Sequence, residues 1–476
     1  DGFIVPTANQ LFAKEYYMRT LYRENPIDKN EIYSLTKKIN DNLHFNFGIK
    51  NLAHRMVFTA CALVAKRYND NALMIGMDWH PLHQSIYNTL TKSIQDAKKV
   101  NDKLGVVLES FAVIKNNLVP NQDNLDDFIT CVGEISKNIY SDFWNGEDVM
   151  AIFFNEFTRY KGKSEQGQVF TPDHITSLMY RITGTSYKDN VLDACCGSGA
   201  FLVKAMSNMI NEVGGIANID EVKKIHNERL FGIEFDKEIY ALACANMMIH
   251  KDGKTNLDDG DSRTVETGKW IKSKKITKVL MNPPYENKYG CLKIVENVLD
   301  NVEYGAICAF LLPDNKLEVG KNTTKKWLNR HTLQKIIKLP DGLFPGTSAS
   351  CFIFKAHESQ NEKEIFACWL KDDGHEVVKN QGRHDVKGKW ESIENHWVDI
   401  IYKQSGDDSI QWIKPTEPLA YKLPEKELVL RESDFEDVVM DYFIFENQLG
   451  GVLKRLTLGL LKDSYSEKSE KEKNND

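Results

Sequence analysis

The stretch NVLDACCGSGAFLVKAM, residues 190–206, decides the fold class of this chain. A short apolar run ends at Asp193, a turn containing Gly197 and Gly199 follows, and an apolar helical pattern begins at Ala200. The two glycines let the backbone turn sharply and approach a ligand at the first turn of the helix, where amide hydrogens are free. Taken alone, a turn of this kind more often binds nothing, so the rest of the chain has to decide its meaning.

Short β-rich runs alternate with longer helical patterns around this stretch. The runs are NVLDAC, RLFGIEF, KVLMNPP, AICAFLLP, LQKIIKLP and SCFIFKA. Such alternation predicts an α/β fold with a parallel sheet and crossover helices. Residues 1–160 instead repeat apolar side chains three and four positions apart, which predicts an N-terminal helical domain. The expected domains are therefore 1–160, an α/β domain at 161–360, an α+β appendage at 361–460 and a disordered polar tail at 461–476.

Composition excludes several classes of protein. The 476 residues suit about two to four folding units, and a hydrophobic content of 42% excludes wholesale disorder. Because 61 Lys and Arg stand against 68 Asp and Glu, the net charge of −7 excludes a histone-like coat on nucleic acid. Nine scattered cysteines show no zinc spacing, so we expect reduced thiols, no metal site and a cytoplasmic protein. The most apolar helical stretch, Met56–Ala65, is about half of what a membrane span needs.

Acidic residues follow the next two predicted strands. The run RLFGIEF places Glu234 at a strand end, with Asp236 two residues later, where a carboxylate can accept hydrogen bonds from ribose hydroxyls. The separation of Asp193 from Glu234 is 234 − 193 = 41 residues, whereas a nicotinamide-binding fold expects roughly 20. A nucleoside without phosphates fits better. One unit later, Asp261 could accept the amine of an adenine, or could equally be a solvated turn residue.

A rigid corner follows the strand KVLM. Asn282-Pro283-Pro284-Tyr285 ends that strand, because the prolines fix two φ angles and remove two backbone donors. The Asn282 side-chain oxygen and the Pro283 carbonyl could both accept from an NH₂ group, while Tyr285 stacks on the attached ring. The sequence therefore predicts a site for a planar amine or amide.

In this order, the glycine turn, the acidic strand ends and the N-P-P-Y corner resemble S-adenosylmethionine-dependent adenine-N6 methyltransferases. The segment GQVFTPDHITSLM, residues 167–179, resembles the F-T-P segment of DNA adenine methyltransferases. With the helical N-terminal region and the later AFLLPDNKLEVG and KLPDGLFPGTSASCFIFK, residues 45–360 look most like the modification subunit of type I restriction-modification systems. The resemblance implies a Rossmann-like class I methyltransferase sheet, S-adenosylmethionine as cofactor and methyl transfer to adenine N6 of a flipped base.

The resemblance also assigns roles to residues. Those expected at the cofactor are Phe170, Thr171 and Pro172 for its methionine part, Asp193, Gly197 and Gly199 for its amino-acid end, Glu234 with Asp236 for the ribose, and Asp261 with Ser262 for the adenine. Those expected at the target base are Asn282, Pro283, Pro284 and Tyr285. No metal is expected.

The expected partners are double-stranded DNA and a specificity subunit, with a restriction subunit as a further candidate. After the catalytic core only about a hundred residues remain, and they carry no base-reading signature. The basic runs at 272–278 and 321–338 suit phosphate contacts and a solvated face equally well. Two alternatives stay open: a methyltransferase acting on RNA or on protein glutamine, and a non-catalytic scaffold that binds the cofactor.

Overall fold

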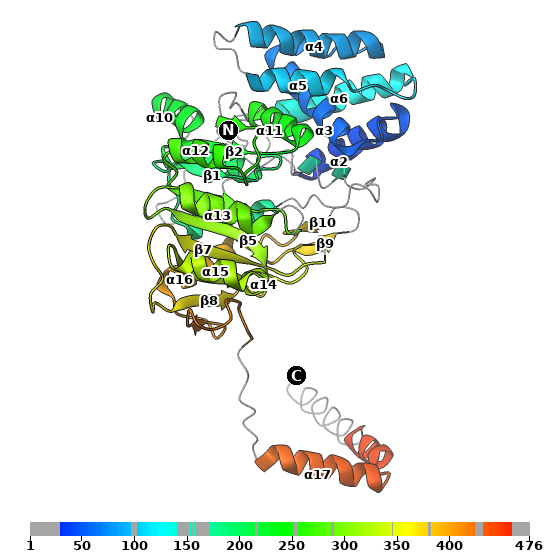
Figure 1. The fold of residues 1–476 in the computed structure, drawn as a ribbon. Helices are drawn as coiled ribbons and strands as arrows, with labels where there is room; N and C mark the ends of the chain where they lie inside the picture. The colour runs from blue at the N-terminus through cyan, green and yellow to red at the C-terminus, as the bar shows by residue number, and fades with distance from the viewer. Residues whose placement is uncertain are drawn as a thin grey trace, which may run out of the picture. The chain divides into compact units, whose positions relative to one another are not determined.

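The computed structural model describes residues 29–96, 102–139, 152–153, 156–157, 171–214, 218–250, 256–286, 290–344, 346–378, 382–423 and 432–458. The chain divides into two compact units, Asp1–Lys422 and Leu423–Asp476 (Figure 1). The first unit contains the N-terminal helices and all the strands. The expected domain boundary at 161–168, Phe170 and the expected tail at 461–476 lie outside the described residues.

The expected helical N-terminal region is confirmed. Its helices are α2 (Lys29–Asp41), α3 (Leu52–Tyr68), α4 (Trp79–Asp96), α5 (Asp102–Ala112) and α6 (Gln122–Ile139). Helix α3 is buried on almost all sides, because α4, α5 and α6 surround it within this region and α11 (Lys237–Ile249) packs on it from the sheet. An apolar stretch such as Met56–Ala65 is therefore the centre of a helical core. No helix among the described residues is long and apolar enough to cross a membrane.

Among the described residues, nine strands form the main sheet, in the order β11-β8-β6-β7-β5-β4-β1-β2-β3. The five strands from β3 to β5 are mutually parallel, as the alternation of strands and helices predicts. They are β1 (Val191–Asp193), β2 (Leu230–Ile233), β3 (Asn256–Asp258), β4 (Lys278–Met281) and β5 (Ile307–Pro313).

The other half of the sheet departs from the expected parallel arrangement. Strand β7 (Ala349–Lys355) lies antiparallel between β5 and β6 (Thr332–Lys338). The reason is the short link between β6 and β7, at 339–348, because a parallel crossover needs about a dozen residues or more. Strand β8 (Ile365–Trp369) then pairs parallel to β6, and β11 (Gln411–Ile413) pairs antiparallel to β8.

The sheet therefore continues past residue 360, where the sequence suggested a separate appendage. What projects from it is a small hairpin of β9 (Glu376–Val378) and β10 (Gly382–His384), followed by α16 (Trp390–Lys403). The run KWESIENHWVDIIY forms this helix, because its apolar residues recur three and four apart.

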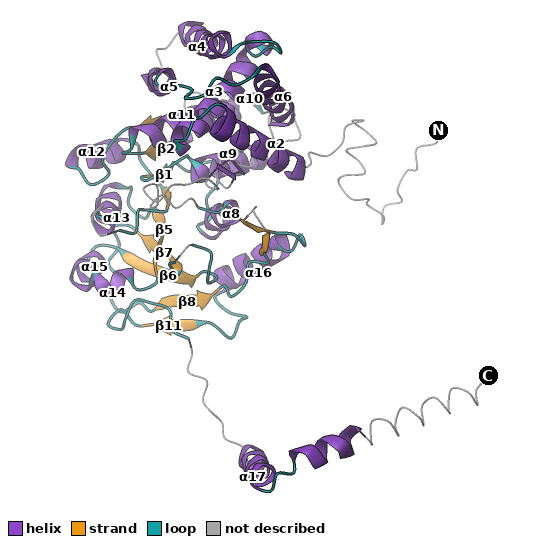
Figure 2. Ribbon diagram, turned by 90° about the vertical axis from the view of Figure 1, so that its right-hand side faces the viewer, coloured by secondary structure: helices purple, strands orange, loops and turns teal. Residues whose placement is uncertain are grey.

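Helices cover both faces of the sheet (Figure 2). One face carries α12 (Val265–Ser273), α13 (Cys291–Asn301), α14 (Lys316–Val319) and α15 (Lys321–Leu328). The other carries α8 (Asp173–Ile182), α9 (Ala200–Glu212), α11 and α16. Strand β4 shows the alternation that this requires, since Val279 and Met281 join one apolar cluster and Leu280 joins the other.

A buried arginine ties the N-terminal helices together. Arg55 in α3 is fully buried, and its guanidinium donates to the Asn40 side chain at 3.0 Å, to the carbonyls of Ile49 and Lys50 at 3.1 and 2.6 Å, and to that of Phe157 at 3.1 Å. Phe157 is 102 residues away in sequence. One side chain therefore satisfies carbonyl groups from three separate segments.

Arg55→Met should lower the free energy of unfolding by about 3 kcal/mol or more, because several buried acceptors lose their donor. Urea denaturation followed by circular dichroism measures the change. The matched control is Arg330→Met, which removes an exposed arginine that pairs with Glu296 and Asp300, and which should cost under about 1 kcal/mol. Equal losses in the two variants would contradict the structural role of Arg55.

Candidate active site

Four parallel strands end at the same edge of the sheet, and each end carries a predicted site residue. Asp193 is the last residue of β1, Glu234 follows β2, Asp261 lies three residues after β3 and Asn282 follows β4. The register pairs Asp193 with Gly232 of β2, so the strand ends are level. Ligands of open α/β sheets bind outside the carboxyl ends of the strands, which makes this edge the candidate site.

The glycine turn forms the wall of this edge beside β1. Gly197 and Gly199 have φ values of +55° and +92°, a region that other residues adopt rarely, and Gly199 caps the start of α9. The Gly197 amide donates to the Glu234 carboxylate at 3.0 Å, so the turn bends toward β2. A Cβ atom at Gly197 would meet no atom of the described residues within 4 Å, so among these residues the turn faces open space.

Two carboxyl groups lie under this turn, Asp193 buried and Glu234 half-buried. Asp193 is 1% exposed and accepts from the Cys195 amide at 3.1 Å. Burial, with a smaller contribution from the nearby charge of Glu234, raises the pKa of Asp193 to about 8. Burial likewise raises the pKa of Glu234, whose two oxygens accept from the amides of Gly197 and Asp236. This pair suits a ligand that brings a positive charge and hydroxyl donors.

The remaining predicted cofactor residues have other contacts in this structure. Asp236 caps α11, since its side chain accepts from the amides of Glu238 and Ile239. Both oxygens of Asp261 accept from the Arg263 guanidinium, at 2.8 and 2.6 Å. The Ser262 hydroxyl donates to the backbone carbonyl of Ala194, the residue after β1. These contacts favour a structural role for Asp236.

An aromatic ring that the sequence analysis did not single out lies beside the Asp261–Arg263 pair. Phe235 is 67% exposed, and the Arg263 guanidinium lies 5.9 Å from its ring centroid. Its position directly after Glu234 at a strand end was the available signal.

The F-T-P segment and the N-P-P-Y corner meet, although they are 111 residues apart. The Asn282 Nδ2 atom donates to Thr171 Oγ1 at 3.0 Å, and Thr171 is buried. Pro172 caps α8, so the segment leads directly into that helix. Asn282 Oδ1 is buried and accepts no hydrogen bond from the described part of the chain. Thr171 thereby fixes the orientation of the carboxamide and leaves its acceptor oxygen for a ligand.

Tyr285 packs at the end of the same corner. Its ring lies edge-on to Phe344, with centroids 6.1 Å apart, and burial raises the pKa of its hydroxyl. That hydroxyl is buried and has no hydrogen-bond partner among the described residues. The Tyr285 carbonyl accepts from Lys316 Nζ at 2.7 Å, and Lys316 is itself buried. Sequence reasoning missed Lys316 and Phe344; the position of Lys316 just after β5 was the available signal.

Residues 147–316 match the family model of N-6 DNA methylases. The chain is 31% identical over 399 residues to the type II restriction enzyme and methyltransferase RM.BcgI of Heyndrickxia coagulans, covering 76% of this chain and 60% of that protein. It is 22% identical over 224 residues to the type I restriction enzyme EcoEI methylase subunit of Escherichia coli, covering 42% and 44% of the two chains. The chain therefore spans 60% or less of these two relatives' length.

The fold is shared with a solved structure from Vibrio vulnificus described as a type I modification subunit. The TM-score is 0.60 at 13% identity, and the match covers 85% of this chain and 98% of the other. The expected Rossmann-like class I methyltransferase sheet with a helical N-terminal region is thus confirmed. Residues 147–316 thus resemble N-6 DNA methylases, within a chain that is similar to methyltransferases of restriction-modification systems.

Proposed function

We propose that this chain transfers a methyl group from S-adenosylmethionine to N6 of an adenine in DNA, as the modification subunit of a restriction-modification complex. The observation that carries the proposal is the Asn282 carboxamide, whose Nδ2 is held by Thr171 while its buried Oδ1 has no partner among the described residues. An acceptor held in this way, beside two prolines and a tyrosine, suits an aromatic amine.

The other end of the edge fits the methyl donor, which supplies a methyl group activated by a positively charged sulfur. The buried carboxyl group of Asp193 would hold its amino group, and Glu234 would accept from its ribose hydroxyls. The open space in front of Gly197 admits the methionine part. Asp261 Oδ2 accepts one hydrogen bond from Arg263 and has a second lone pair with which it would accept from the adenine amine.

The residues of the corner act on the target amine. Its lone pair is delocalised into the adenine ring, which makes it a poor nucleophile. Asn282 Oδ1 and the Pro283 carbonyl, by accepting its two hydrogens, would favour the pyramidal nitrogen that attacks in line. Tyr285 would stack on the ring of the flipped base and recover part of the cost of unstacking. These roles of Pro283, Pro284 and Tyr285 are part of the proposal.

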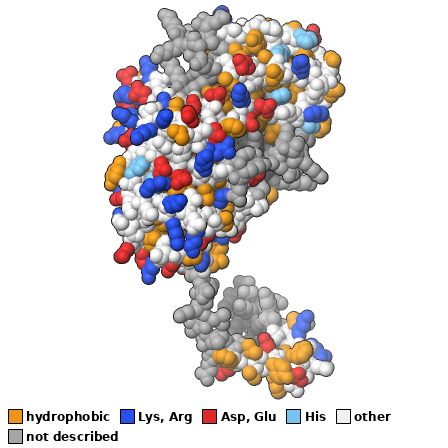
Figure 3. Space-filling model, in the orientation of Figure 1, with side chains coloured by type: hydrophobic (Ala, Val, Ile, Leu, Met, Phe, Trp, Pro, Cys, Tyr) orange, Lys and Arg blue, Asp and Glu red, His pale blue; other side chains and the backbone are white. Residues whose placement is uncertain are grey.

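The surface of the second unit is the observation that favours a partner subunit. Helix α17 (Glu432–Glu446) and the helical residues 450–458 expose apolar side chains on several sides, and Figure 3 shows hydrophobic atoms over much of the visible face of this unit. An apolar surface of this extent is typical of a protein-protein contact. The exposed side chains include Phe435, Val438, Val439, Met440, Tyr442, Phe443 and Phe445. We assign this surface to a specificity subunit that selects the DNA sequence.

The charges on the visible face of the first unit give limited support for contact with DNA. On the face shown in Figure 3, Lys and Arg side chains are interspersed with Asp and Glu rather than gathered in one patch. Non-specific affinity for phosphates should therefore be modest, which again favours a partner that provides sequence choice.

A filter-binding assay with labelled S-adenosylmethionine tests the substrate class. We expect label in duplex DNA, strongly enhanced by the specificity subunit, and none in RNA or protein. Label in RNA or in a protein glutamine would instead support the first alternative. Cofactor binding without transfer to any of the three would support the scaffold alternative.

Asn282→Ala should lower the rate of methyl transfer at least about 100-fold, the scale seen when one preorganised polar group is removed from a transition state. Cofactor affinity should stay nearly unchanged, because Asn282 lies at the target base. Single-turnover kinetics and calorimetric titration measure the two quantities. Asn329→Ala, an exposed position at the end of α15, is the matched control. Turnover near that of the wild type would sink the assignment of the corner.

Cofactor binding should release close to one proton at pH 6.5. With a pKa near 8, Asp193 is mostly protonated in the free protein at this pH, and a bound ammonium group favours its ionised form. Affinity should therefore rise with pH below about 7.5. Calorimetry in buffers of different ionisation enthalpy counts the protons, and Asp193→Asn should abolish the release. The same release in both proteins would show that another group titrates.

A further inference from the structure

A cluster of His174, Asp373, His375 and Arg383, joined by hydrogen bonds and packed against Trp390, connects the start of α8 to the region between β8 and β11. His174 lies in the first turn of α8, two residues after Pro172, and its contact with Asp373 spans 199 residues. Asp373 is fully buried, and the side chains of His174 and His375 are about 10% exposed. The two imidazoles stack with centroids 3.9 Å apart, and Trp390 lies edge-on to both.

Every oxygen of the Asp373 carboxylate already has a donor. Oδ2 accepts from His174 Nε2 at 3.1 Å, while Oδ1 accepts from the Arg383 guanidinium and from the His375 amide. Burial alone would raise the pKa of Asp373, but these donors and the charge of Arg383 hold it well below its usual range. The carboxylate is therefore ionised, which requires His174 Nε2 to carry a proton.

His174, Asp373 and His375 come within 4.8 Å of one another, as metal ligands would. The contacts of these side chains favour a hydrogen-bonded cluster instead. His174 Nε2 donates to Asp373, and His375 Nδ1 donates to the Asp373 carbonyl at 2.8 Å. A metal would have to displace these protons and share the carboxylate with the Arg383 guanidinium. Stacked imidazole rings also direct their nitrogen lone pairs along nearly parallel planes rather than at one ion.

Helix α8 is fastened at both ends by the same region. At its last turn, Arg181 pairs with Glu394 of α16 at 3.0 Å and donates to Asn395 at 2.8 Å, and the Tyr402 hydroxyl donates to the Arg181 carbonyl. His174 and Arg181 are seven residues apart, so they lie on the same face of the helix. The hairpin region and α16 thus fix both the position of α8 along its axis and its rotation.

What α8 positions is the acceptor oxygen of the proposed site. Thr171 lies two residues before the helix begins and receives the hydrogen bond from Asn282 that orients the carboxamide. We infer that His174 and Asp373 are positioning residues for methyl transfer, acting through α8 and Thr171 on Asn282. This inference rests on the proposed function, and it brings residues 371–403 into the catalytic machinery as a support.

A double-mutant cycle tests whether Asp373 acts through Thr171. Asp373→Asn replaces one of the two acceptor oxygens of the carboxylate, so one of its hydrogen-bond donors loses its acceptor. Thr171→Val removes the acceptor for Asn282 Nδ2. Each should lower the single-turnover rate about tenfold, the scale of a small misplacement of a reacting group. The double variant should also lose about tenfold, because both changes disturb one linkage, whereas independent effects would multiply to about 100-fold. Multiplied losses, or a wild-type rate for Asp373→Asn, would overturn the inference.

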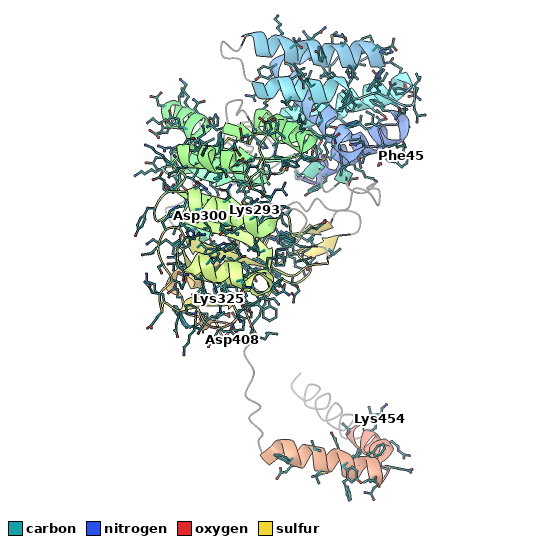
Figure 4. The ribbon with its side chains drawn as sticks, viewed as in Figure 1. Phe45, Lys293, Asp300, Lys325, Asp408 and Lys454 are labelled. Carbon is teal, nitrogen blue, oxygen red and sulfur yellow. The ribbon has the colours of Figure 1, made fainter. Side chains whose placement is uncertain are left out.

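Hydrogen exchange provides a readout that needs no substrate. Amide exchange in the first turn of α8, at Ile175 and Thr176, should be about tenfold faster in Asp373→Asn. The matched control is Asp408→Asn, labelled in Figure 4, which removes an exposed partner of Lys371 in the same region. Unchanged exchange in Asp373→Asn would overturn the inference. A wild-type protein that transfers no methyl group would contradict the proposed function alone, and exchange would then decide the coupling.

Discussion

The hydrogen bond from Asn282 Nδ2 to Thr171 Oγ1 is the contact on which the proposed site depends. A carboxamide can present either its oxygen or its nitrogen, and only the oxygen can accept a hydrogen from an amine. In the structure Thr171 receives the nitrogen, so the oxygen is the atom left to face the ligand. The bond also joins two segments that no strand pairing connects, the turn before α8 and the corner after β4.

The parallel half of the sheet brings this contact to the same edge as the acidic residues. Its strand ends are level, so an acid after β1, an acid after β2 and the corner after β4 share one edge. The carboxyl groups of Asp193 and Glu234 at one end of the edge and an oriented acceptor at the other suit two different ligands. One brings positive charge and hydroxyl groups, and the other brings an amine.

Much of this site could be predicted because its parts are local in sequence. Strand, glycine turn and helix follow one another within residues 190–206, and the prolines at 283 and 284 mark their corner without help from the rest of the chain. The antiparallel strand β7 was not foreseen, since the short link at 339–348 outweighs the general pattern of alternation. The role of the buried Arg55 could not be predicted from the sequence, because only tertiary packing supplies its carbonyl partners.

Contacts between distant segments were the least predictable part. His174 and Asp373 are ordinary polar residues in sequence, and 199 positions separate them. Lys316 supports the Tyr285 carbonyl from the end of the next strand, and only its buried position reveals that role. Lys316 and Asp373 both lie in later parts of the chain, and local patterns do not reveal their contacts.

The most direct test of the account is a structure of the protein with its specificity subunit, duplex DNA containing the target site and a non-reactive analogue of S-adenosylmethionine. The account predicts a flipped adenine whose N6 lies about 2.7–3.2 Å from Asn282 Oδ1, while Nδ2 remains on Thr171. An adenine amine bound elsewhere, or an Asn282 carboxamide turned so that Nδ2 faces the base, would contradict it.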